Sequence, residues 1–152
     1  MSKVTTIGEE GVALIKSFEG FRSHPYKCPA GIPTIGYGAT FYPNGKKVTM
    51  DDPAITEQQA TDMLKNMLEG FEKHVDSYCI DTVNQNQFDA LVSFCYNVGP
   101  ANLKSSTLLK KVNANPNDPA IRAEFVKWTK GGGKTLPGLV RRREAEANLY
   151  FK

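Results

Sequence analysis

The sequence has little of several features that mark large protein classes. Its three cysteines, Cys28, Cys79 and Cys95, include no CxxC pair, which argues against a disulfide scaffold and a zinc ribbon. His24 stands near Cys28, but two ligands make no metal site, so we expect no metal and no cofactor. No apolar run is long enough for a signal peptide or a membrane span, so we expect synthesis in the cytoplasm and no stable membrane association.

The charge of the chain is also modest. Lys and Arg number 19 and Asp and Glu 16, which gives a net charge of +3 at pH 7. Without a long basic stripe this argues against nucleic-acid binding, although an anionic partner is compatible with it. A hydrophobic content of 40% over 152 residues suits a globular protein with one domain, residues 1–152.

Capping signals and the spacing of apolar residues predict a largely helical chain. Thr6 with Glu9 and Thr56 with Gln59 each form a capping box, and Gly20 suits the position after a helix end. The expected helices are residues 6–19, a long one from 56, 84–98, a short one after Ser105-Ser106, one from Asp118-Pro119 to Trp128, and one from about Pro137.

Residues 21–52 differ in character, because they are rich in glycine, proline and alternating apolar residues. The turn Asn44-Gly45 predicts a hairpin between strands 33–41 and 46–49. Alternation places Thr34 on a small, polar and open face of that hairpin. The sequence therefore predicts an α+β fold with a small β lobe of about residues 21–55. A larger helical lobe of about residues 56–152 plus the first helix is joined to it by the long helix, with a cleft between the lobes.

Glu19 is the strongest single candidate for catalysis. A carboxyl group at a helix C-terminus feels the negative end of the helix dipole, which favours its protonated form. The flanking Phe18 and Phe21 would remove water and act in the same direction. A protonated carboxylic acid is the general acid that glycoside hydrolysis needs. The alternative is an inert, solvated glutamate at a helix end.

Two further residues of the β lobe carry reactive groups. Cys28 is a candidate nucleophile, or an electrostatic partner of Glu19 if its thiol ionises; the alternative is a small buried hydrophobic residue. Thr34 offers a hydroxyl able to hold a water molecule, and the alternative is an ordinary β-branched strand residue.

The helical lobe carries weaker candidates. Tyr96 and Asn97 could line a carbohydrate site by stacking and hydrogen bonding, with capping and core packing as the alternatives. The run Arg141–Arg143 is expected to form a solvated helix face, with at least one arginine free to point toward an acidic cleft or a substrate.

The order of these residues resembles the catalytic signature of phage lysozymes of glycoside hydrolase family 24. Glu19 is followed after eight residues by Cys28 and after five more by Thr34. The segments TIGYG, QFDALVSFCYNVG and LPGLVRRREAEANLYF resemble further motifs of that family, so the resemblance covers nearly the whole chain. It implies a lysozyme-like fold and hydrolysis of the β-1,4 bond between N-acetylmuramic acid and N-acetylglucosamine in peptidoglycan.

The resemblance also implies roles for particular residues. Glu19 corresponds to the general acid, Cys28 to the second catalytic position and Thr34 to the residue that positions a water. Tyr96, Asn97 and Ser106 fall where the helical lobe would face the glycan.

Cysteine at position 28 departs from the aspartate that many family members carry. A neutral thiol cannot replace the charge of a carboxylate. A thiolate could stabilise the positive charge of the transition state, the thiol could only shape the pocket, or the sulfur could attack the sugar. Because Lys27 is the one obvious cation nearby, the second option is slightly favoured.

The expected context is lysis of a bacterial host by a phage or prophage. The protein would be a monomer that stays in the host cytoplasm until a separate holin releases it to the peptidoglycan of the periplasm. A lytic transglycosylase and a non-catalytic glycan-binding module are the alternatives, and Thr34 on an open face favours hydrolysis over the first of them.

Overall fold

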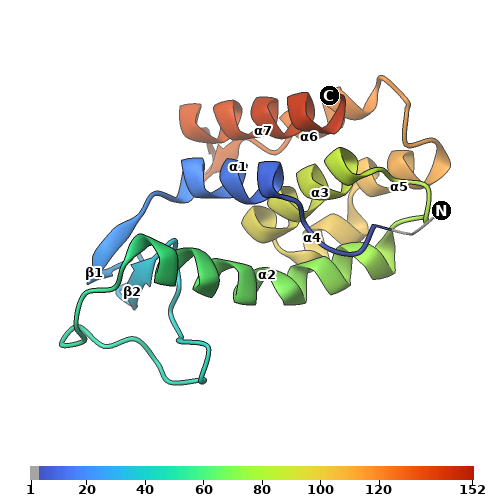
Figure 1. Cartoon of the computed structure of the whole chain (residues 1–152). Helices are drawn as coiled ribbons and strands as arrows, with labels where there is room; N and C mark the ends of the chain where they lie inside the picture. Colours follow the sequence, from blue (N-terminus) through green and yellow to red (C-terminus); the bar gives the residue numbers. More distant parts are fainter. Residues whose placement is uncertain (1–3) are drawn as a thin grey trace. The chain divides into compact units, whose positions relative to one another are not determined.

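A computed structural model describes residues 4–152 (Figure 1). Seven helices and two small antiparallel sheets occur within these residues. The chain forms two compact units, one of residues 15–69 and one of residues 70–152 with the N-terminal segment as far as Leu14. Helices α1 (Glu9–Glu19) and α2 (Glu57–Tyr78) contribute residues to both units.

The sheet of the unit of residues 15–69 pairs β1 (Arg22–Lys27) with β2 (Pro33–Gly36). The register places Tyr26 opposite Thr34, and the ladder shifts between Arg22 and Tyr26. A β-bulge or irregularity of this kind lets an irregular segment such as SHPY join a sheet. The sheet therefore brings the residues that follow β1 against the first residues of β2.

The expected hairpin between residues 33–41 and 46–49 forms only beside its turn, and two glycines explain why. Gly36 and Gly38 have φ angles of +67° and +95°, in the left-handed region that ends an extended strand. The part that forms is an isolated bridge between Phe41 and Lys47, flanked by two backbone hydrogen bonds. The alternation of faces assumed beyond Gly36 does not exist.

A small hydrophobic core holds this unit together. Its fully buried members come from the segments after β1 and from the first turns of α2, and they are Ile35, Ala39, Val48 and Met63, with Tyr42, Ile55 and Met67 packed against them. The capping box predicted for α2 is confirmed. The Thr56 hydroxyl accepts from the Gln59 N–H at 3.1 Å, and the Gln59 side chain accepts from the Thr56 N–H at 2.8 Å.

Helix α1 begins later than expected because its N-terminus is capped from a distance. The Ile7 N–H donates to Glu72 at 2.6 Å, and the Gly8 N–H donates to Asp89 at 2.9 Å. These carboxylates bind the two amides just before the first turn, where the sequence predicted a local capping box of residues 6–9.

The helical unit is built around α3 (Gln85–Val98) and α7 (Pro137–Tyr150), which pack against each other. Helix α6 (Ile121–Val126) also packs against α7. The remaining elements are α4 (Pro100–Ser105), α5 (Thr107–Ala114), β3 (Lys130–Gly131) and β4 (Lys134–Thr135).

The helix expected at residues 84–98 is present as α3, and it begins with a capping box of Asn84 and Gln87 that was not predicted. The Ser106 hydroxyl caps α5, where the sequence predicted a helix start. Helix α6 is shorter than expected, because Asp118 caps the Ala120 N–H at 2.9 Å in a turn before the helix. The β3–β4 hairpin was not expected from the sequence.

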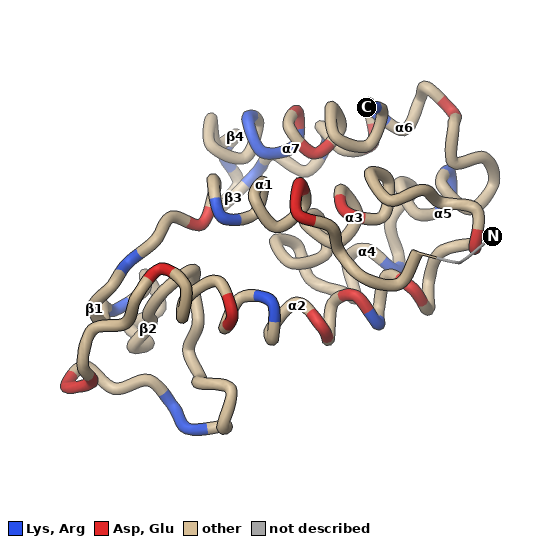
Figure 2. Tube along the Cα trace, viewed as in Figure 1, with Lys and Arg blue, Asp and Glu red and all other residues tan. Residues whose placement is uncertain are grey.

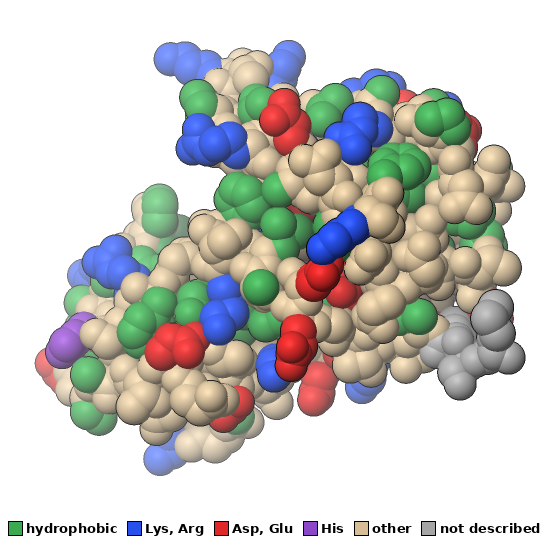
Figure 3. Space-filling view, turned by 45° about the horizontal axis from the view of Figure 1, so that its top comes forward, with side chains coloured by type: hydrophobic (Ala, Val, Ile, Leu, Met, Phe, Trp, Pro, Cys, Tyr) green, Lys and Arg blue, Asp and Glu red, His purple; other side chains and the backbone are tan. Residues whose placement is uncertain are grey.

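Charged residues of both signs are interspersed along the chain. Acidic residues with interspersed lysines follow α2 (Figure 2), and the face drawn in Figure 3 shows both kinds of charge scattered among polar and apolar side chains. Between residues 4 and 152, no helix is both long enough and apolar enough to cross a bilayer.

Candidate active site

Glu19 is the last residue of α1, as the sequence predicted. The chain turns away at Gly20, whose φ is +73° and whose N–H donates to the Lys16 carbonyl at 3.0 Å. A left-handed glycine of this kind ends a helix without strain. The Glu19 side chain is half-buried, and β1 starts three residues later.

Cys28 and Thr34 are brought together by the loop between β1 and β2. The Cys28 N–H donates to the Ile32 carbonyl at 3.0 Å, and the Gly31 N–H donates to the Cys28 carbonyl at 2.7 Å. Gly31 has a φ of +81°, so this tight loop needs glycine there. The loop folds back on itself and places the Thr34 side chain within hydrogen-bonding reach of the Cys28 sulfur.

The surroundings of Cys28 lower the pKa of its thiol. The backbone N–H of Ile32 makes the largest contribution, and the amide of Ala30 and the Thr34 hydroxyl act in the same direction, against a smaller effect of burial. Hydrogen-bond donors stabilise the anionic sulfur. The sequence offers only Lys27 as an activating cation, because residue identities do not reveal where backbone amides point.

Thr34 is not on an open face, contrary to the expectation. Its side chain is 3% exposed, and its hydroxyl donates to the Ile32 carbonyl at 2.8 Å. One hydroxyl proton cannot serve both the carbonyl and the sulfur, so Thr34 donates to Cys28 only when it releases Ile32. The hydroxyl is thus part of the Cys28 loop.

A second polar cluster in the same unit was missed by sequence reasoning. The Glu57 carboxylate accepts from Tyr37 and Thr61, both at 2.7 Å, and pairs with Lys16 at 2.8 Å. Lys16, then Thr61 and Tyr37, lower the pKa of Glu57 to about 2. Burial and the hydrogen bond to Glu57 raise the pKa of Tyr37.

This cluster connects the segments that carry the candidate residues. Lys16 lies on α1 one turn before Glu19, Tyr37 follows β2, and Glu57 begins α2. The Lys16 ammonium also lies 5.4 Å from the centre of the Tyr37 ring. The only signal in the sequence was Tyr37 within TIGYG, and a single tyrosine does not name its partners.

The helical unit holds the remaining candidates. Tyr96 packs edge-on against Phe71, with ring centres 5.1 Å apart, and Asn97 is exposed and accepts a hydrogen bond from Arg143. Ser106 is buried, accepts from the Leu109 N–H at 3.0 Å and donates to the Leu103 carbonyl at 2.7 Å. The hydroxyl of Ser106 therefore serves the backbone, and its contact with a glycan stays a prediction.

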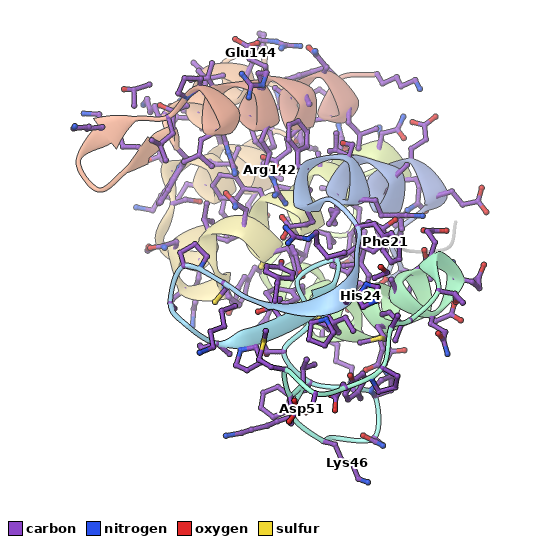
Figure 4. All side chains as sticks on the ribbon, turned by 90° about the vertical axis from the view of Figure 1, so that its left-hand side faces the viewer. Phe21, His24, Lys46, Asp51, Arg142 and Glu144 are labelled. Carbon is purple, nitrogen blue, oxygen red and sulfur yellow. The ribbon has the colours of Figure 1, made fainter. Side chains whose placement is uncertain are left out.

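The arginine run does not form a solvated face, contrary to the expectation. Arg142 and Arg143 are 3% and 0% exposed, and both pair with the buried Glu146. Figure 4 shows Arg142 pointing from α7 into the helical unit, whereas Glu144 points away from it. Arg141 is the exposed member of the run.

Asn97 lies on the rim of a surface cavity of about 370 Å³ in the helical unit. The other lining residues are Val98, Asn102, Lys127, Trp128, Lys130 and Leu139. Over the described part of the chain, no group of three or more His, Cys, Asp or Glu side chains gathers as metal ligands do.

Comparison with known proteins identifies the family. The model of the phage lysozyme family matches residues 16–146. The chain is 44% identical over 145 residues to the endolysin of Bacillus phage B103, an alignment that covers 95% of this chain and 54% of that endolysin. It spans the same 54% of the endolysin of Bacillus phage PZA, so it has about half the length of these relatives.

Solved structures agree with this result. The endolysin from Escherichia coli O157:H7 phage FAHEc1 matches with a TM-score of 0.88 at 37% identity, over 97% of this chain and 94% of that one. The muramidase domain of SpmX from Asticaccaulis excentricus matches with a TM-score of 0.82 at 34% identity, over 97% and 98%. The chain belongs to the phage lysozyme family, and the α+β, lysozyme-like fold expected from the sequence is confirmed.

Proposed function

We propose that this chain is a muramidase that hydrolyses the β-1,4 bond between N-acetylmuramic acid and N-acetylglucosamine in peptidoglycan. Membership in the phage lysozyme family supports this activity, as do the names endolysin and muramidase domain among its relatives. The observation that carries the proposal is Glu19 at the last residue of α1, in the same unit as the Cys28 and Thr34 loop.

Glu19 acts as the general acid. It gives its proton to the glycosidic oxygen, which leaves with the electrons of the broken bond, and the sugar becomes an oxocarbenium-like species. Water then adds to the anomeric carbon and releases a proton, which the Glu19 carboxylate is free to accept. The position supports the role, because the half-buried Glu19 side chain ends α1 in the same unit as the loop of Cys28 and Thr34.

Cys28 acts as a thiolate that stabilises the positive sugar. Its lowered pKa and the amides of the loop support this role over a neutral thiol that only shapes the pocket. The thiolate places a negative charge where many family members have an aspartate. In this proposal Thr34 turns its hydroxyl proton from the Ile32 carbonyl to the sulfur, and its oxygen then keeps a lone pair for the attacking water.

The helical unit contributes glycan contacts in the same proposal. Tyr96 offers an aromatic face and Asn97 an exposed amide, and Ser106 fixes the start of α5. None of these residues needs to take part in proton transfer.

Digestion of purified peptidoglycan tests the catalytic assignment. We expect Glu19→Gln to lower the rate by about 10²–10⁴-fold, the usual contribution of a general acid, and the matched Glu9→Gln on the same helix to leave it intact. An unchanged rate for Glu19→Gln would remove the general-acid role.

Mass spectrometry of the products distinguishes hydrolysis from lytic transglycosylation, because a transglycosylase leaves 1,6-anhydro ends. Thr34 on an open face had favoured hydrolysis, and its burial removes that argument.

The same proposal covers the biological setting. The protein serves host lysis by a phage or prophage, acts as a monomer, and waits in the cytoplasm until a separate holin admits it to the periplasm. Expression in a Gram-negative host with and without a membrane pore tests this order. Lysis without any pore would contradict it.

A further inference from the structure

Helix α7 carries a buried charge cluster that the proposed reaction does not use. The Glu146 carboxylate pairs with Arg143 at 2.8 Å and with Arg142 at 3.3 Å, and it accepts from the Ser93 hydroxyl at 2.5 Å. Glu146 and Arg143 are both 0% exposed. One carboxylate thus faces two guanidinium groups, an arrangement that is costly to bury and needs further partners for its positive charge.

Arg143 finds that partner in Asn97. A guanidinium nitrogen of Arg143 donates to the Asn97 side-chain oxygen, and the guanidinium lies 5.1 Å from the centre of the Phe94 ring. Of the other two nitrogens of Arg143, Nη1 is the one that pairs with Glu146, and Nε is buried without a hydrogen bond. Glu146, Phe94 and Asn97 therefore hold Arg143 in one place.

This contact decides which end of the Asn97 amide faces outward. A guanidinium group donates hydrogen bonds and accepts none, so the oxygen of Asn97 must face Arg143. The amide nitrogen, with two N–H donors, then points away from the buried cluster. Because Asn97 is exposed on the rim of the cavity, that donor is presented at the surface of the helical unit.

The neighbouring amide on the rim behaves differently. Asn102 donates one N–H of its amide to the Val98 carbonyl at 2.7 Å, so the backbone fixes its orientation and engages half of its donor capacity. A ligand in this cavity therefore meets both N–H groups of Asn97, whereas Asn102 offers one N–H and its oxygen.

We infer that Arg143 is a positioning residue which, through Asn97, makes the helical unit select an accepting oxygen of the glycan, the carbonyl of an N-acetyl group. This rests on the proposed function, because it requires peptidoglycan to be the substrate. Both sugars of the repeating unit carry an N-acetyl group, so every register of the strand presents such an oxygen. Removal of the acetyl group replaces that acceptor with an ammonium donor, which the outward N–H groups of Asn97 cannot bind.

Asn97→Asp tests the inference with little risk to the fold. The aspartate keeps the contact with Arg143 as a charge-assisted bond and loses the outward donor. For soluble glycan strands freed of stem peptides, we expect KM to rise about tenfold or more, with kcat changed far less. On N-deacetylated strands the preference should reverse, because a carboxylate accepts from an ammonium group.

The control is Asn148→Asp, which makes the same change on α7. Asn148 accepts from Arg122 at 2.9 Å, so this variant also places a carboxylate beside an arginine. We expect its KM for both substrates to equal that of the unmodified protein.

Arg143→Met adds a second test, since it leaves one cation, Arg142, beside Glu146. The released Asn97 amide can rotate, so KM should rise severalfold, and the effects of Arg143→Met and Asn97→Asp should not add. If Arg143→Met does not fold, Asn97→Asp carries the test alone.

A folded Asn97→Asp with unchanged KM on acetylated strands overturns the inference. An equal rise of KM on acetylated and N-deacetylated strands overturns the N-acetyl assignment. If the unmodified protein cleaves neither substrate, the proposed function fails instead.

Discussion

The Lys16 ammonium lies 2.8 Å from the Glu57 carboxylate, and Lys16 stands one helical turn before Glu19. Glu57 also accepts from Tyr37, which follows β2. The end of α1, the start of α2 and the segment after β2 thus share one carboxylate. Because Lys16 lies on α1 next to Glu19, its ion pair with Glu57 holds the end of the helix that carries the proposed general acid.

Replacement of Lys16 should therefore lower kcat by a larger factor than it lowers the folding equilibrium constant. In Lys16→Met the last turn of α1 loses its anchor, and small displacements of a catalytic group cost rate steeply. We expect kcat on purified peptidoglycan to fall about tenfold, with a smaller change in KM. Lys65→Met, an exposed lysine of α2, is the control. Equal kcat values for the two variants would show that the anchor does not act on Glu19.

Glu57 should make the stability of the protein depend on acid pH. Its pKa is lowered to about 2 from an ordinary value of 4.5, so the folded carboxylate binds a proton less readily than the unfolded one. This stabilisation is complete above pH 4.5 and is lost as the pH falls through about 2. The Tm of Glu57→Gln should accordingly decline less between those values than that of the unmodified protein.

A matched variant separates this effect from general acid denaturation. Glu69→Gln removes an exposed carboxylate of the same helix, and its Tm should follow the unmodified protein across the whole range. If the curve for Glu57→Gln parallels it, the Lys16 and Tyr37 contacts do not stabilise the charged form.

Cys28 should react as an activated thiol. Because the loop amides and Thr34 lower its pKa, the rate of alkylation by iodoacetamide should rise with pH around a midpoint below the ordinary value of 9.0. Thr34→Val removes one donor and should move the midpoint upward. Cys95 serves as the internal control, since burial raises its pKa to about 12 and leaves it 0% exposed. A midpoint at or above 9.0 would return Cys28 to the pocket-shaping role.

The helix starts show which parts of the fold sequence patterns can predict. The capping box of α2 joins residues three apart, so a short window of sequence predicted it, and the box of α3 has the same spacing although it was not predicted. The start of α1 depends on Glu72 and Asp89, 65 and 81 residues away from the amides that they cap. No local pattern contains such information.

The residues of the candidate site also differ in whether a local pattern could predict their surroundings. Glu19 could be placed because a helix end and the glycine after it are local features. The burial of Thr34 could not, because Thr34 and Ile35 are both buried although they point to opposite faces of β2, and alternation alone predicts only one buried face. Arg142 and Arg143 resembled a solvated run because their burial depends on how α7 packs against α3 and α6, which no local pattern contains.

Two glycines with the same backbone conformation allow strain and packing to be measured separately. Gly36 and Gly45 have φ angles of +67° and +88°, so alanine is strained at both. That strain costs about 1–2 kcal/mol. A Cβ at Gly36 would also lie 3.2 Å from the Ala60 Cβ, whereas one at Gly45 meets nothing within 4 Å.

We therefore expect Gly36→Ala to lower the free energy of unfolding more than Gly45→Ala does. The difference should be of order 1–3 kcal/mol, the usual cost of overpacking a core. Urea unfolding of the two variants measures it, with equal m values as the check that both unfold in the same way. Equal losses would mean that α2 moves aside at Ala60, and the close approach of the Gly36 backbone to that helix would then carry no packing energy.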